Sequence, residues 1–430
     1  MQSFEVSEKP RRRLKVLLSA YACEPGRGSE EGIGWNTVLQ MSRAHDVWVM
    51  VTEEFRAPIE RFASQNPMPG VHWEFFNLPR WLVFWHKEHR FRRLHYHLWQ
   101  IGAYRRAQAL HDRFSFDIAH HITYGSYWRP SFLARLPIPY IWGPVGGAEN
   151  VPFRFYGSLS TRGKVFDIQK NLTEQLTTRL DPLTRRTAQR AAVALVPTER
   201  TAHKVRRVGA PNIRMMPQIA LPAAEIERLA QVPIRRDPTP FRVISLGRMI
   251  SWKGLHLGLR AFARFASEYP DAEYWHSGDG PERERFMRLA QELGVADRVR
   301  VFTKQKRAEA LEALAQSDVL LFPCLHDEPG WVVLEALAAG RPVVYLLGMP
   351  HTPDADQSGF TPRTDTAERA VEDMAAALLR LATDPDLRAR MGEAGRAQVA
   401  AHFNWDTRGQ EFLALYDEIA QAAAQGVSPS

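Results

Sequence analysis

The chain has 430 residues, too many for one comfortable hydrophobic core, so two domains are expected. Charged residues make up 24% of it, as in ordinary globular enzymes, and no apolar run approaches the ~18 residues that span a membrane. A net charge of +8 indicates anionic partners, either phosphorylated substrates or an anionic membrane face. No zinc-finger spacing, aromatic RNA-binding pattern or heptad repeat favours nucleic acid. The two cysteines, Cys23 and Cys324, have no metal-ligand spacing and indicate a reducing compartment.

Short aliphatic runs alternate with helical patterns, which predicts an α/β fold with parallel sheets. Three arginines at 11–13 precede an apolar run that Lys15 interrupts, so we predict a first strand there rather than a signal peptide. The first half of the chain has strands predicted at 14–20, 47–52, 71–76, 117–122 and 193–196, and a helix at 29–43. A basic and aromatic segment, 81–106, is predicted either to cover the first sheet as a helix or to lie on an anionic membrane.

Five prolines between positions 217 and 240 surround one short helical piece, and we predict an interdomain linker there. The alternation then restarts, with strands predicted at 241–246, 272–277, 299–303, 319–322 and 343–346 and helices at 255–269, 281–293, 307–316 and 331–339. Further helices are expected at 367–382, 385–399 and 407–424. We therefore predict two Rossmann-like domains, 1–220 and 221–404, and a C-terminal helix within 405–430 that can pack back on the first.

The sharpest motif runs from His326 to Val344, between a strand and a helix. The first N–H groups of that helix favour anions. Glu335 lies about one turn inside, where a carboxylate can accept two hydroxyls of a ribose. Asp327 and Glu328 lie in the preceding loop, where a carboxylate can orient a sugar ring. A capped helix with acidic residues near its N-terminus would also explain this pattern. The motif therefore supports a binding site only together with the other motifs.

A second motif is Gly247-Arg248 followed by Ser251-Trp252-Lys253-Gly254. Gly247 ends a strand, so the backbone can pass close to a ligand at the carboxyl edge of the sheet. Arg248 and Lys253 are two cations at a strand-to-helix crossing, which suits a diphosphate. The turn at 278–282, which contains Gly-Asp-Gly-Pro, is expected to have a structural role beside this loop.

In the first domain, the glycines between 26 and 34 lack the spacing of a dinucleotide fingerprint, so a dehydrogenase is a poor interpretation. Ser29 is a candidate N-cap of the first helix. His120 and His121 end a strand at the edge where a site is expected. Because neighbouring strand residues point to opposite faces, only one of them is expected to reach a cleft. Both remain candidates.

Asp327 and Glu335 are separated by seven residues, and the Gly-Arg and Lys-Gly pairs of the second motif are intact. With these motifs the sequence resembles the family-four retaining glycosyltransferases, whose GT-B fold has two Rossmann-like domains facing across a cleft. The resemblance implies that Arg248 and Lys253 neutralise the departing diphosphate and that Glu335 holds the nucleotide ribose. It implies that Asp327, one methylene shorter than the usual Glu, or else Glu328 positions the donor sugar. Further donor contacts are implied for Gly28, Gly247, Gly330 and Trp331, and a contact to the sugar for His120 or His121.

The function implied is retaining transfer of a sugar from a nucleoside-diphosphate sugar to a glycan or lipid-linked acceptor, in cell-surface polysaccharide or glycolipid synthesis. The first domain would bind the acceptor and the second the donor, with no metal and no other cofactor. We expect a cytoplasmic protein that can associate peripherally with the inner face of the membrane. A nucleotide-sugar epimerase of the same fold and a non-catalytic scaffold in polysaccharide assembly are the alternatives. The donor base, the sugar and the acceptor stay open.

Overall fold

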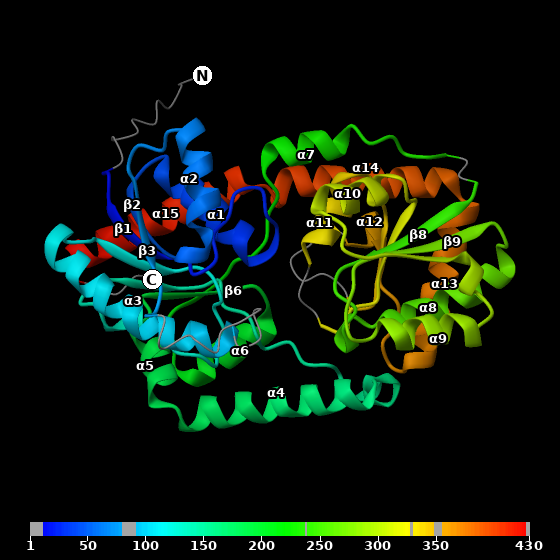
Figure 1. Ribbon diagram of the computed structural model, residues 1–430, viewed down its shortest axis with the longest axis horizontal. Helices are drawn as coiled ribbons and strands as arrows, with labels where there is room; N and C mark the ends of the chain where they lie inside the picture. The colour runs from blue at the N-terminus through cyan, green and yellow to red at the C-terminus, as the bar shows by residue number, and fades with distance from the viewer. Residues whose placement is uncertain (1–11, 80–91, 237–238, 327–329, 348–354, 427–430) are drawn as a thin grey trace, which may run out of the picture. The chain divides into compact units, whose positions relative to one another are not determined.

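The computed structural model describes residues 12–79, 92–236, 239–326, 330–347 and 355–426. They divide into two compact units, each built on its own parallel sheet with helices packed on it (Figure 1). One unit comprises Met1–Ala148, Leu176–Gln218 and Arg408–Ser430, and the other comprises Glu149–Gln175 and Ile219–Thr407. The predicted α/β fold with two Rossmann-like units is confirmed.

The sheet of the first unit has seven strands in the order β3-β2-β1-β4-β5-β6-β7. The strands are β1 Lys15–Ser19, β2 Asp46–Thr52, β3 Val71–Phe76, β4 Ile118–His121, β5 Tyr140–Trp142, β6 Val193–Val196 and β7 Ile213–Met215. Most of their residues are buried, as expected for parallel strands covered by helices on both faces. The helices are α1 Ser29–Ser42, α2 Arg56–Gln65, α3 Arg92–Phe114, α5 Pro182–Arg190 and α6 Glu199–Val208. The strand order reverses between β1 and β4.

The sheet of the second unit has six strands in the order β10-β9-β8-β11-β12-β13. They are β8 Phe241–Leu246, β9 Ala272–Ser277, β10 Val299–Phe302, β11 Val319–Phe322, β12 Val343–Tyr345 and β13 Gly359–Phe360. The helices are α7 Ala223–Ala230, α8 Leu255–Glu268, α9 Arg283–Glu292, α10 Arg307–Ala315, α11 Trp331–Ala338, α12 Ala355–Ser358, α13 Ala367–Thr383 and α14 Pro385–His402. Here the strand order reverses between β8 and β11.

The chain enters the second unit earlier than the proline-rich linker suggested. We expected residues 1–220 to form one domain, but Glu149–Gln175 cluster with the second unit. The reason is packing, because Val151, Phe155 and Leu159 are buried in the core of that unit. The long helix α4 (Thr161–Leu180) follows, beginning among residues of the second unit and ending among residues of the first.

The last helix, α15 (Trp405–Ala424), belongs to the first unit from Arg408 onward. Its Tyr416 is fully buried, and the hydroxyl lies 2.6 Å from Nδ1 of His120 on β4. The C-terminal helix therefore packs back on the first sheet, although the chain reaches it from the second unit.

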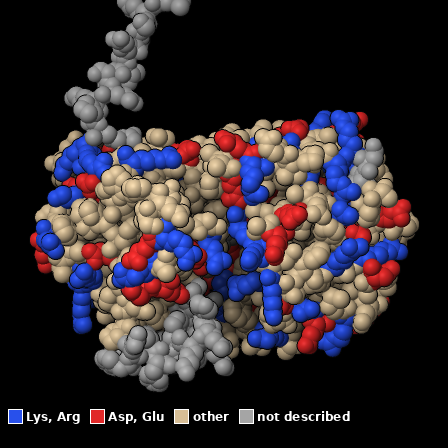
Figure 2. All heavy atoms as spheres, turned by 45° about the horizontal axis from the view of Figure 1, so that its top comes forward, with Lys and Arg blue, Asp and Glu red and all other residues tan. Residues whose placement is uncertain are grey.

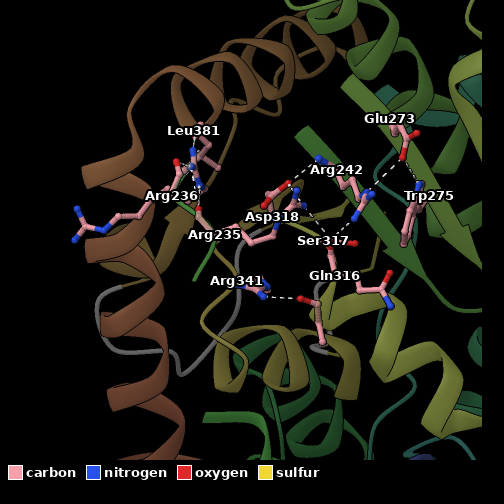
Figure 3. Close-up of polar contacts among 12 residues, drawn as sticks. Arg235, Arg236, Arg242, Glu273, Trp275, Gln316, Ser317, Asp318, Arg341 and Leu381 are labelled. Carbon is pink, nitrogen blue, oxygen red and sulfur yellow. Dashed lines mark hydrogen bonds and ion pairs between the residues drawn. The ribbon is translucent and has the colours of Figure 1, made fainter. Parts of the chain in front are cut away.

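Buried charges hold the amino edge of the second sheet (Figure 3). Asp318, just before β11, accepts hydrogen bonds from the backbone N–H of Arg242 at 2.8 Å and from Nη1 of Arg235 at 3.1 Å. Arg341, just before β12, donates to the carbonyl of Ala315 at 2.6 Å, and burial lowers its pKa to about 10. This network ties the segment before β8 to the sheet, at the end of the strands opposite to the predicted site.

Candidate functional site

The second sheet brings both sequence motifs to one place. β8 and β11 are parallel neighbours, with Ile244 paired to Leu320, and the strand order reverses between them. In open α/β sheets, ligands bind outside the carboxyl ends of the strands at such a reversal. The segments that leave these two carboxyl ends carry Gly247 to Lys253 and His326 to Glu335, so the topology places the two motifs at a single edge.

The loop after β8 exposes its backbone. Gly247 has φ +120° and open space where a side chain would begin, and Arg248 beside it is exposed. Behind the loop, the N–H of Met249 donates to the carbonyl of Asp279 at 2.9 Å, and a side chain at Gly280 would lie 2.4 Å from the carbonyl of Met249. The Gly-Asp-Gly-Pro turn therefore supports the loop by backbone contact, which is the structural role expected for it.

The loops after β8 and β11 are in direct contact. Gly254 has φ +64°, and a side chain there would lie 1.9 Å from the carbonyl oxygen of Pro323. The N–H of Leu325 donates to the carbonyl of Trp252 at 2.8 Å. The Trp252 ring stacks on His326, with centroids 5.5 Å apart and planes at 11°. Only glycine fits at 254, because both the left-handed backbone and the close carbonyl exclude a side chain.

Lys253 lies beside the start of α11. Its Nζ is 5.1 Å from the ring centroid of Phe322, the last residue of β11. A side chain at Gly330, the N-cap of α11, would begin 3.5 Å from the same ring. Trp331 follows, and its Nε1 is buried without a hydrogen-bond partner in the described part of the chain. An ammonium and a helix N-terminus thus meet at Phe322, a combination that favours an anion, and the next residue of the helix carries the unused N–H donor.

Glu335 is buried on α11 and is not a free carboxylate. It accepts a hydrogen bond from Arg307, the first residue of α10, which also donates to Glu225 of α7. Burial raises the pKa of Glu335, and the Arg307 guanidinium opposes that rise. A ribose bound by Glu335 would therefore contact a carboxylate that also accepts a hydrogen bond from Arg307. Arg307 was not among the predicted site residues, because its only signal in the sequence is a cation at the first position of a helix that begins at this sheet edge.

The three residues on which the donor site was predicted thus lie on segments leaving one edge of the sheet. No hydrogen bond or ion pair within the described ranges joins Arg248, Lys253 and Glu335 to one another. Lys253 is linked to α11 through Phe322, whereas Glu335 faces Arg307. Asp327 and Glu328 lie outside the described residues, so the choice between them stays a prediction.

The two candidate histidines, His120 and His121, are both buried, on opposite faces of β4. Nδ1 of His120 lies 2.6 Å from the Tyr416 hydroxyl and its Nε2 lies 2.6 Å from the carbonyl of Gly143. Nδ1 of His121 lies 2.9 Å from the Ser131 hydroxyl and its Nε2 lies 3.0 Å from the Tyr96 hydroxyl. Burial lowers their pKa values to about 4 and about 3. We expected one histidine to reach a cleft, but both have the environment of core histidines.

The start of α1 differs from the prediction in its cap. Gly28 is the N-cap, while Ser29, the predicted cap, is the first helical residue with φ +59°. Glu30 then accepts a hydrogen bond at 2.9 Å from the N–H of Tyr124, in the loop after β4. Burial raises the pKa of Glu30 to about 7. The strand-order reversal of the first sheet therefore carries a carboxyl group that titrates near neutrality, a property common at functional sites.

The basic and aromatic segment is described only from Arg92 onward. In that part, Tyr96 and Trp99 are buried, and Nε1 of Trp99 donates to the carbonyl of Phe76 at 2.8 Å. Arg106 pairs with Glu74 of β3. In this part α3 covers the first sheet. This was one of the two interpretations of the segment, and the other was contact with an anionic membrane. On the face drawn in Figure 2, basic and acidic side chains lie side by side. Within the described ranges, no helix combines the length and apolar character that crossing a bilayer requires.

The second unit contains the segment that resembles known proteins. Residues 229–398 match the family model of the glycosyl transferases group 1. The chain is 33% identical over 233 residues to a D-inositol 3-phosphate glycosyltransferase of Corynebacterium jeikeium, covering 50% of this chain and 54% of that protein. It is 33% identical over 189 residues to a GDP-mannose-dependent phosphatidylinositol monomannoside mannosyltransferase of Mycolicibacterium smegmatis, covering 40% and 47%. The chain thus spans about half the length of these curated relatives.

Two solved structures share the fold. A sucrose-phosphate synthase from Thermosynechococcus elongatus aligns with a TM-score of 0.64 and 16% identity, covering 95% of this chain and all of that one. Anabaena Alr3699/HepE in complex with UDP aligns with a TM-score of 0.58 and 16% identity, covering 94% and 99%. Residues 229–398 are therefore similar to the glycosyl transferases group 1 family, and this chain has the GT-B fold that its motifs implied.

Proposed function

We propose that this protein is a retaining glycosyltransferase that moves a sugar from a nucleoside-diphosphate sugar to a glycan or lipid-linked acceptor. The observation that carries the proposal is the cluster around Phe322, where Lys253 and the start of α11 meet at the reversal of the second sheet. The cluster lies within the segment that matches the family model. It offers positive charge and N–H donors to a diphosphate and contains no carboxylate among its described members.

The chemistry follows from where charge develops. As the bond between the sugar and the diphosphate breaks, negative charge grows on the leaving phosphate, and Lys253 and Arg248 stabilise it. The acceptor hydroxyl attacks from the face that the leaving group occupies, and the leaving phosphate oxygen takes its proton. This route needs no strong base from the protein and no metal ion. Glu335, held by Arg307, accepts the ribose hydroxyls and fixes the nucleotide.

The relatives support the class of donor and acceptor. One is named for a D-inositol 3-phosphate acceptor, and another for GDP-mannose and a phosphatidylinositol mannoside. A structural neighbour holds UDP. We infer a nucleoside-diphosphate sugar as donor and a role in polysaccharide or glycolipid synthesis at the cytoplasmic face of a membrane.

A thermal-shift screen against UDP, GDP and ADP sugars tests the donor site, because a ligand that binds only the folded state raises its melting temperature. We expect one nucleotide to stabilise the protein and both Lys253→Ala and Glu335→Ala to abolish that shift. Lys304→Ala, which removes an exposed lysine after β10, is the matched control and should keep it. Unchanged shifts in both site variants would place the donor elsewhere.

One observation favours a second candidate, an epimerase of the same fold. Such an enzyme needs acid and base groups in the first unit, and Glu30 has a pKa of about 7 at the strand-order reversal there. Product analysis separates the two functions. An epimerase converts the nucleotide sugar without an acceptor, whereas a transferase releases the nucleotide only when the acceptor is glycosylated. A protein that binds no nucleotide sugar would be the non-catalytic scaffold instead.

A further inference from the structure

An apolar stripe runs along the outer face of α4. The large hydrophobic side chains on this helix that are exposed have fractional exposures between 48% and 74%, and they are Val165, Ile168, Leu172, Leu176 and Leu180. Steps of three and four residues place them on one face of a helix. Figure 1 shows α4 as one long continuous helix. Contiguous exposed apolar surface of this kind marks an interaction site rather than ordinary solvent exposure.

The opposite face of α4 contacts the second unit along the part of the helix that belongs to that unit. Asp167 and Glu174 are buried, and Asp167 accepts hydrogen bonds from Asn171 at 3.0 Å and from the hydroxyl of Tyr156. Phe166 stacks on Trp252 with ring centroids 5.1 Å apart. The helix is therefore anchored by its polar and aromatic face, and the apolar stripe points outward.

Charge along α4 is divided in the same way. Its two acidic residues lie on the buried face, so the outward face carries no carboxylate. Arg162 and Arg179 are exposed at the two ends of the stripe, and Lys164 lies at its margin. None of these three cations forms an ion pair with a residue that the structure describes. The outer face thus combines aliphatic side chains with positive charge only.

We propose that the outer face of α4 docks this protein on an anionic lipid bilayer, with the helix lying in the plane of the interface. Helices of this composition bury their apolar face about 5–10 Å into the boundary between headgroups and acyl chains, and cations at their margins are drawn to anionic lipid. A second copy of α4 fits less well, because antiparallel packing would bring Arg162 of one copy to Arg179 of the other without any acid on either face.

The position of α4 gives the docking a consequence for the site. Phe166 on its inner face stacks on Trp252, and Trp252 stacks on His326. These rings join α4 to the two loops that leave β8 and β11. If the proposed function holds, docking brings the donor loops to the lipid surface where a lipid-linked acceptor resides. The docking itself does not rest on the proposed function, because lipid binding is measured without turnover.

Vesicle sedimentation of the full chain tests the surface. We expect binding to vesicles of phosphatidylglycerol and phosphatidylcholine in equal parts, weaker binding to phosphatidylcholine alone, and a decrease with added salt. Ile168→Ser/Leu172→Ser should lower the partition coefficient at least about tenfold, since two apolar side chains no longer enter the bilayer. Arg162→Glu/Arg179→Glu should remove the preference for anionic vesicles. The control Gln169→Ser/Thr173→Ser, on the same turns, should bind as the wild type does.

Melting curves of the variants check that they are folded, which is expected for changes at exposed positions. Wild-type protein that fails to sediment with anionic vesicles at low salt overturns the proposal. So does a serine variant that sediments as well as the wild type. Sedimentation velocity supplies the remaining test, because a wild-type dimer that becomes monomeric in the serine variant would show that a second copy covers this face.

Discussion

Lys253 rests on Phe322, with its ammonium nitrogen 5.1 Å from the ring centroid, so a residue that follows β8 is positioned by the last residue of β11. An aromatic face attracts a cation without neutralising it, and the attraction amounts to about 0.5–1 kcal/mol at an exposed site. A carboxylate in the same place would hold the lysine but cancel its charge. The arrangement therefore fixes the direction of Lys253 and leaves its charge available to an anion.

Replacing Lys253 should affect the reaction much more than the fold. We expect Lys253→Ala to lower kcat/KM by about 10²–10³-fold, because a charge that stabilises the leaving phosphate is lost. Lys253→Arg should recover part of the activity, since it restores the charge with different geometry. The measurement is steady-state turnover of the donor found by the thermal-shift screen, with melting temperatures of each variant. Wild-type kcat/KM in the alanine variant would remove Lys253 from the site.

Arg307 should contribute more to the free energy of unfolding than its partly exposed position suggests. Arg307→Ala leaves Glu335 and Glu225 without the guanidinium that both contact, so we expect a loss of about 2 kcal/mol in the free energy of unfolding. Urea titration measures it. In the double variant Arg307→Ala/Glu335→Gln the loss should be smaller than in Arg307→Ala alone, because position 335 then carries no buried charge, while Glu225 keeps its contact with Arg228 at 3.8 Å. Strictly additive losses would mean that the pair contributes no coupling.

Glu30 should make the protein less stable as pH rises. Its pKa is about 7 in the folded state and 4.5 ordinarily, so between these values the folded state keeps a proton that the unfolded state releases. Stability from this group therefore falls from pH 4.5 to pH 7 and stays low above it. Glu30→Gln removes the effect and can still accept the hydrogen bond from Tyr124. Relative to the wild type it should be nearly neutral at pH 4.5 and stabilising by about 2 kcal/mol at pH 8.

The control for this prediction is the comparison of the two proteins across pH. His120 and His121 are buried neutral and have lowered pKa values, so both proteins lose stability as pH falls below the ordinary histidine value. That contribution cancels when urea-unfolding free energies of wild type and variant are subtracted at each pH. A difference that does not change between pH 4.5 and pH 8 would contradict the raised pKa of Glu30.

Much of the second unit could be predicted from the sequence, because buried parallel strands read as uninterrupted aliphatic runs bounded by glycine and proline. The predicted strand 319–322 has this pattern and coincides with β11, and the strands predicted at 241–246 and 272–277 coincide with β8 and β9 although both contain polar residues. The strands and helices of the first unit were harder to predict. β5 and β7 have three residues each, too few for a pattern, and no helix was predicted over α5 or α6.

Packing between distant segments could not be predicted from local pattern. The proline-rich stretch at 217–240 suggested one crossing between units, but Glu149–Gln175 already belong to the second unit through buried residues such as Phe155. Aliphatic residues at helical spacing in α4 indicate an apolar face, which is usually a core face. Only the structure shows that this face stays exposed.

The same limit applies to the site. The motifs placed Gly247, Lys253 and the start of α11 on one sheet edge, because spacing and strand ends are local features. They gave no sign that Glu335 is paired with Arg307, which joins residues 28 positions apart. The burial of His120 depends on Tyr416, 296 positions away. Whether a histidine at a strand end reaches a ligand is thus decided by which helix covers it.

Gly254 gives the sharpest test of how the two donor loops are held together. It and Gly294 have nearly the same left-handed backbone, with φ of +64° and +69°, but a side chain at 254 would strike the carbonyl of Pro323 whereas 294 has open space. Gly294→Ala should cost about 1 kcal/mol in unfolding free energy, the usual penalty of that backbone for alanine. Gly254→Ala should cost at least about 3 kcal/mol and abolish the nucleotide-induced thermal shift, because the loops after β8 and β11 must separate. Equal losses in the two variants would show that contact with Pro323 does not hold the loops.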